Sequence, residues 1–132
     1  MLLTYAHASF VAAGFIFMAA GFITARFLKR KMWWLKLHKI FGISGACCVL
    51  AGVCFESIHL SLIGAGHFNV PHACLGMLII LLSLITPAMG LMQIKMHGAA
   101  SKIRILHRWS GRAIMILTGI NIISGLYTAG II

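Results

Sequence analysis

The apolar residues of this chain gather in long stretches that contain no Asp, Glu, Lys or Arg. These stretches cover residues 5–25, 40–55, 57–94 and 113–132. The third is too long for one membrane span, and the segment GAGHFNVPH inside it has the Gly and Pro residues of a turn. A helix needs about 20 apolar residues to cross a bilayer. The pattern therefore predicts four helices, over about 4–27, 33–56, 70–94 and 103–129.

Composition places these helices in a membrane. Hydrophobic residues make up 61% of the 132 residues, and the mean hydropathy is +1.04. A soluble fold of this size could not bury so much apolar surface. Backbone groups in lipid must be hydrogen-bonded internally, which favours helices over open strands. We expect an all-α integral membrane protein, an antiparallel four-helix bundle that forms one domain over residues 1–132.

The basic residues that give the net charge of +10 lie on one side of the predicted membrane topology. All eleven basic residues lie around the first and third connections, and the second connection and both termini have none. They are Arg26, Lys29, Arg30, Lys31, Lys36, Lys39, Lys95, Lys102, Arg104, Arg108 and Arg112. The positive-inside rule then predicts a multi-pass membrane protein with its basic connections in the cytoplasm and both termini external. Such a face attracts anionic lipid headgroups, so we expect membrane lipid and no nucleic acid as a partner.

Each predicted helix has a histidine within its first turns, namely His7, His38, His72 and His107. Since successive helices run in opposite directions, His7 and His72 are expected near the external face and the other two near the cytoplasmic face. Two imidazoles that face each other are a natural pair of axial ligands for a b-type haem iron. The spacing therefore predicts two haem b sites, one in each leaflet, with these histidines as the metal ligands.

Three of the histidines are followed by a glycine four residues later. Residues i and i+4 share one helix face, so these glycines lie beneath the imidazoles and leave room for a flat macrocycle. They are Gly42, Gly76 and Gly111. After His7 the corresponding position is Val11, and Gly14 and Gly21 are expected to take over that function. Small residues also allow helices to pack closely without any cofactor, and that alternative stays open.

The other histidines and an internal proline have simpler interpretations. His59, His67 and His97 fall in or beside the connections and are expected to be solvated or interfacial. Pro87 lies inside the third predicted helix and removes one backbone hydrogen bond. Thr86 is expected to help satisfy the carbonyl that this frees.

The residues also resemble a known family. The stretches AHASFVAAGFIFMAAGFITARFLKRKMWWLKLHKIFG, HFNVPHACLG and LHRWSGRAIMILTGINIISGL look like the four core helices of the cytochrome b561 family. The last stretch, with H-x-x-x-G-R followed by Asn121, Gly125 and Leu126, is the most specific match. The resemblance implies a bundle with two haems b, bound by His7 with His72 and by His38 with His107. It also implies transmembrane electron transfer from a cytoplasmic or membrane reductant to an external acceptor.

Many members of that family have six helices or a fused soluble domain. The four-helix pattern here therefore suggests an electron carrier that is completed by a partner protein, with a soluble reductant or quinol as donor. Alternatives stay open: a quinone-linked cytochrome b subunit of a larger complex, or a pigment-binding or structural membrane subunit. A transporter of copper or zinc would use the soft His, Cys and Met ligands, but its ion path would normally include intramembrane acids.

Overall fold

The chain folds into four long helices. The computed structural model describes residues 1–132 except residues 97 and 99. The described residues contain no strand, and the helices confirm the predicted all-α fold. Helix α1 covers Leu2–Phe27, α2 Trp34–Leu62, α3 Pro71–Lys95 and α4 Ala100–Thr128.

The ends of the helices follow local chemistry. Helix α2 continues to Leu62 instead of ending near residue 56, because residues 57–63 contain no Gly or Pro and the turn comes only at Gly64, which has a φ of +67°. Pro71 occupies the first turn of α3, where its missing amide hydrogen costs nothing. Pro87 lies inside α3. The Thr86 hydroxyl next to it has no hydrogen-bond partner among the described residues, so the expected role of Thr86 in satisfying the freed carbonyl is wrong.

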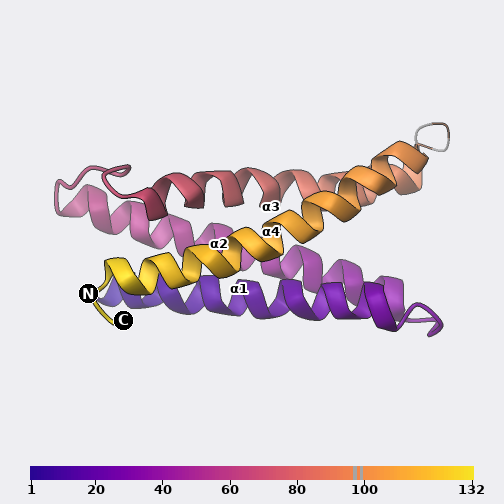
Figure 1. Ribbon diagram of the computed structural model, residues 1–132, viewed down its shortest axis with the longest axis horizontal. Helices are drawn as coiled ribbons and strands as arrows, with labels where there is room; N and C mark the ends of the chain where they lie inside the picture. Colours follow the sequence, from indigo (N-terminus) through magenta and orange to yellow (C-terminus); the bar gives the residue numbers. More distant parts are fainter. Residues whose placement is uncertain (97, 99) are drawn as a thin grey trace.

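The four helices run antiparallel, and the two ends of the bundle differ in charge (Figure 1). The α1–α2 and α3–α4 connections share one end, called here the basic end, with the basic residues around them. Both termini and the α2–α3 connection lie at the other end, called here the terminal end. Helices α1, α2 and α3 are each long and apolar enough to cross a membrane. The fold is thus a helical membrane bundle.

The bundle consists of two helical hairpins, because α1 packs mainly against α2 and α3 mainly against α4. Glycines let α1 and α2 approach closely. A Cβ atom on Gly14 would lie 2.9 Å from the Gly45 carbonyl oxygen, and one on Gly45 would lie 3.0 Å from that of Gly14. A Cβ atom on Gly21 would lie 3.4 Å from the Gly42 nitrogen. Gly14 and Gly21 therefore serve helix packing, and the expectation that they clear a slot beside His7 is wrong.

One apolar side chain from each helix meets at the middle of the bundle. These four residues, called here the septum, are Met18, Val49, Ile79 and Ile114, exposed by 9%, 2%, 3% and 4%. They form the buried core cluster. Other large apolar side chains on all four helices, such as Ile16 and Ile123, are more than half exposed at 65% and 61%. This distribution fits a bundle whose outer surface faces lipid.

The hairpin contact can be tested at Gly14. We expect Gly14→Ala to lower the free energy of unfolding by about 1–3 kcal/mol, because the new methyl group must displace backbone and Val49. The matched control is Gly119→Ala. Gly119 lines neither of the two cavities between the hairpins, and its Cβ would make only ordinary contacts with the Phe15 ring, at 3.8 Å and 3.9 Å. The measurement is the midpoint of thermal unfolding in detergent. Equal midpoints for the two variants would contradict the close contact.

Candidate functional site

Two cavities lie between the hairpins, one toward each end of the bundle. The cavity at the basic end has a volume of about 600 Å³ and is lined by His38 and His107. The cavity at the terminal end has a volume of about 230 Å³ and is lined by His7 and His72. The structure thus brings together the same pairs of histidines that the sequence predicts.

In each pair the two imidazole rings face each other across a short gap. The ring centroids of His7 and His72 are 6.1 Å apart, and those of His38 and His107 are 5.9 Å apart. The planes within each pair are nearly perpendicular, at 89° and 85°. A metal ion bound by two imidazoles lies about 2.0–2.1 Å from each ligating nitrogen, and each nitrogen lies about 1 Å from the centroid of its ring. The two centroids would then be roughly 6 Å apart. The gap in both pairs therefore suits one metal ion.

All four rings are oriented by the same kind of hydrogen bond. In each, Nδ1 donates to a main-chain carbonyl of the other helix in its hairpin. The acceptors are Gly52 for His7 (2.9 Å), Gly21 for His38 (2.9 Å), Asn121 for His72 (3.0 Å) and Thr86 for His107 (2.9 Å). Since a carbonyl can only accept, Nδ1 carries the proton and Nε2 keeps a lone pair. This is the tautomer of histidines that bind a metal through Nε2.

The four hydrogen bonds follow one spacing rule. Gly21 is fourteen residues after His7, and it accepts from His38 of the partner helix. Gly52, Thr86 and Asn121 are likewise fourteen residues after His38, His72 and His107. Both hairpins therefore have the same register relative to their histidines. Fourteen residues rise by about 21 Å along a helix, which is the axial offset between the two histidine pairs.

The glycines at the i+4 positions face free space. A Cβ atom on Gly42 would meet nothing within 4 Å. One on Gly76 would meet only the Asn121 amide nitrogen, at 3.7 Å, and one on Gly111 only Thr86, at 4.0 Å. All three glycines line the cavities. The room that the sequence predicts beneath the imidazoles is thus present in the structure.

Two further glycines, which the sequence analysis did not single out, support rings from the opposite helix. A Cβ atom on Gly125 would lie 2.7 Å from Cε1 of His72, and one on Gly90 would lie 3.1 Å from Cε1 of His107. Only a residue without a side chain lets either ring lie this close to the backbone. Gly90 and Gly125 each follow the histidine of their own helix by eighteen residues. That equal spacing is the signal by which they could have been found.

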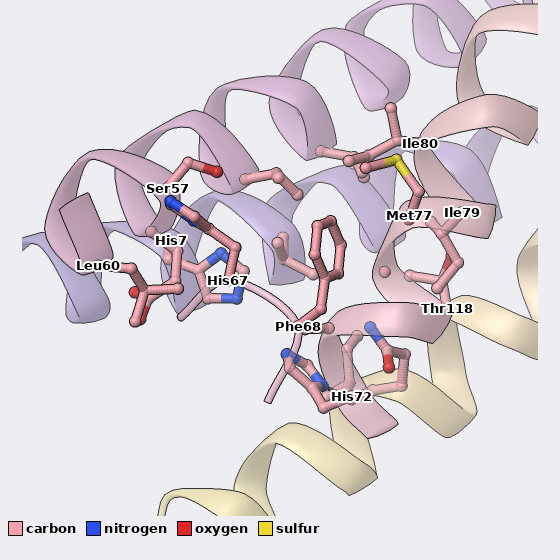
Figure 2. A pocket seen from close by; sticks show the side chains of 18 residues that line it. His7, Ser57, Leu60, His67, Phe68, His72, Met77, Ile79, Ile80 and Thr118 are labelled. Atoms are coloured by element: carbon pink, nitrogen blue, oxygen red, sulfur yellow. Dashed lines mark hydrogen bonds between the residues drawn. The ribbon is translucent and has the colours of Figure 1, made fainter. Parts of the chain in front are cut away.

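The remaining histidines do not belong to the two pairs. His59 lies in the last turn of α2, with Nδ1 3.1 Å from the Thr4 hydroxyl and 3.4 Å from the Glu56 carboxylate. His59 is thus held by side chains of the bundle. His67 and Phe68 come from the α2–α3 connection and line the terminal-end cavity (Figure 2). His97 lies outside the described residues.

The two cavities differ in charge. Six basic residues line the basic-end cavity, namely Arg26, Lys29, Lys39, Arg104, Arg108 and Arg112. Glu56 is the charged residue that lines the terminal-end cavity. Among the described residues, no group of three or more His, Cys, Asp or Glu side chains could hold a metal ion. Each cavity instead holds one pair of imidazoles.

The hydrogen bonds to the carbonyls can be tested in the haem-free protein. We expect His7, His38, His72 and His107 to be Nδ1-protonated when neutral, because each Nδ1 has a carbonyl acceptor. Nitrogen chemical shifts of ¹⁵N-histidine-labelled protein distinguish the two tautomers, and single substitutions assign the signals. Nε2-protonated rings at these four positions would contradict the geometry.

Comparison with protein families gives one match. The model of the family described as "Eukaryotic cytochrome b561" matches residues 6–132, nearly the whole chain. Comparison with curated proteins and with solved structures found no match.

Proposed function

Because the chain belongs to the cytochrome b561 family, we propose that it carries electrons across a membrane through two b-type haems, one in each cavity. Membership of this family implies haem binding, electron transport and a membrane location. The number of haems, their ligands and the direction of transfer are our proposal. The observation that carries it is the pair of facing imidazoles in each cavity.

The residues present fit haem at both ends. His7 with His72, and His38 with His107, would supply the two nitrogen ligands. Each ring uses Nδ1 for its hydrogen bond among the described residues, and the ring centroids of each pair are about 6 Å apart. Gly76 at the terminal end, and Gly42 and Gly111 at the basic end, leave open space beside the imidazoles. The terminal-end cavity is smaller, and Phe68 of the α2–α3 connection, 58% exposed, lines it.

A bound haem supplies a single-electron iron couple, and the chain supplies everything that orients and insulates it. The carbonyls of Gly21, Gly52, Thr86 and Asn121 hold the imidazole planes and raise the basicity of the ligating nitrogens. Perpendicular planes within each pair follow from these bonds. The pairing by facing rings also favours a six-coordinate haem over a pigment with one axial ligand.

The path across the membrane follows from the register of the helices. The two histidine pairs are offset by about 21 Å along the bundle, and a macrocycle at each pair would narrow the gap between redox centres. The septum fills the centre of the bundle with apolar side chains. An arrangement of this kind lets electrons pass between the cavities while it keeps water and ions out of the middle of the bundle.

The charge distribution supports a direction of electron transfer, from the basic end to the terminal end. The positive-inside rule places the basic end in the cytoplasm and both termini outside. An anionic reductant would be attracted to the six cations that line the basic-end cavity. We propose a soluble reductant or quinol as donor at this end, and an external acceptor, or a partner protein that carries one, at the terminal end.

Single histidine variants test this function. We expect His7→Ala and His38→Ala each to lower the haem content of the purified protein by about half. Transfer in sealed vesicles, from an internal reductant to external ferricyanide, should fall at least tenfold because a single centre cannot span the bilayer. The control is His59→Gln, outside both pairs. Full transfer by either alanine variant would contradict the two-haem path.

The donor end can be tested separately. We expect the double variant Arg108→Gln/Arg112→Gln to slow reduction by an anionic reductant several-fold at low ionic strength, with unchanged haem content. The matched control, Arg30→Gln/Lys31→Gln, removes the same charge from residues that do not line the cavity. Stopped-flow reduction measures both. Equal rates for the two double variants would remove the proposed role of Arg108 and Arg112.

A further inference from the structure

Four buried polar side chains on α3 and α4 each have an oxygen without a hydrogen-bond partner among the described residues. Ser83, Thr86, Thr118 and Asn121 are exposed by only 1%, 8%, 1% and 7%. Their side-chain oxygens form no hydrogen bond with any described residue. Buried polar atoms in native proteins are nearly always hydrogen-bonded, to protein or to ordered water.

Hydroxyls elsewhere in the bundle satisfy themselves within their own helix. Thr24, Ser61, Ser110 and Thr128 each donate to a carbonyl three or four residues earlier. Ser83, Thr86 and Thr118 lie in the same kind of helix, yet their hydroxyls do not make this bond. Their orientation therefore leaves them available to a ligand outside the helix.

The four residues form two equivalent pairs, one in each cavity. Ser83 and Thr118 are eleven residues after the histidines of their helices, and Thr86 and Asn121 are fourteen residues after them. Ser83 and Thr86 line the basic-end cavity, and Thr118 and Asn121 line the terminal-end cavity. Within each pair the spacing is i,i+3, which brings the Cβ atoms within about 5–6 Å on one helix face.

The α1–α2 hairpin has no polar side chains at the equivalent positions. At the same distances from its histidines, α1 and α2 have Met18 and Val49, then Gly21 and Gly52. At these inner positions the polar side chains of each cavity therefore come from the α3–α4 hairpin. Ile79 and Ile114 each precede the polar pair of their own helix by four residues, and both belong to the septum, which keeps the pairs apart.

We propose that each polar pair binds ordered water at the inner end of its cavity. A buried water molecule needs two to four polar partners, and each pair presents two side-chain groups within reach of a single water. At the basic end a third acceptor is near, since Pro87 has no amide hydrogen to donate to the Ser83 carbonyl. The septum separates the two water sites, so they form no continuous file across the membrane.

The water sites act on the cofactor, and this part of the inference rests on the proposed function. Thr86 and Asn121 also provide the carbonyls that hold His107 and His72, so each site adjoins a proposed iron ligand. Water and hydroxyl dipoles stabilise the more highly charged ferric state. A site without them is less polar, and its reduction potential is higher.

Wild-type protein provides the first test. Redox-difference infrared spectra in H₂¹⁶O and H₂¹⁸O report O–H bands of buried water near the haems. We expect water bands that shift in H₂¹⁸O. Ser83→Ala should remove the bands from the basic-end water, and Thr118→Val those from the terminal-end water. The absence of isotope-sensitive water bands from haem-loaded wild-type protein would overturn the proposal.

Potentiometric titration then locates each site. We expect Ser83→Ala to raise one of the two midpoint potentials and Thr118→Val to raise the other, with haem content unchanged. Thr128→Val is the matched control, because the Thr128 hydroxyl already donates to the Ser124 carbonyl and Thr128 lines neither cavity. Thr118→Ser keeps the hydroxyl and should retain the wild-type midpoints.

These experiments distinguish a failure of the water sites from a failure of the proposed function. Suppose that the midpoint potentials stay unchanged in both variants while the unfolding temperature rises. The hydroxyls then bind no water, and replacing them with apolar groups removes the cost of a buried unpaired polar group. This result would overturn the water sites alone. A wild-type protein that binds no haem would instead overturn the proposed function.

Discussion

The hydrogen bonds from four histidine Nδ1 atoms to carbonyls of the neighbouring helix link the fold to its chemistry. Each bond fixes the orientation of a ring and, because the acceptor is always fourteen residues after the partner's histidine, it also fixes the register of a hairpin. A shift of one helix against the other by a single residue would separate both histidine donors of that hairpin from their acceptors. The position of both ring pairs, and hence of both proposed haems, depends on this register.

Glycine has two opposite functions around these rings. Gly14 and Gly45 bring α1 and α2 into backbone contact, whereas Gly42 and Gly76 leave open space inside the cavities. The difference comes from what lies opposite each residue. Small residues within a hairpin meet another backbone, and small residues between the hairpins meet a cavity. Tight hairpins and a loose contact between them together give a bundle that is rigid at its ligands and open to a flat cofactor.

Much of this could be predicted from the sequence, because charge-free apolar stretches define membrane helices and alternating helix directions pair His7 with His72. Other features depend on tertiary contacts. The spacing from His7 could not show that Gly14 packs against Gly45, since that depends on the other helix. Main-chain acceptors such as the Gly52 carbonyl are invisible in a pattern of side chains. Helix α2 extends to Leu62 because the turn begins only at Gly64.

The central claim is that the chain holds two six-coordinate haems, each between two imidazoles. Its most direct test is the haem b content per chain of the purified protein, determined together with the electron paramagnetic resonance spectrum of the ferric state. The account predicts two haems per chain, both low-spin, with the highly anisotropic signals of perpendicular imidazole planes. One haem per chain, or high-spin iron with a single axial ligand, would contradict it.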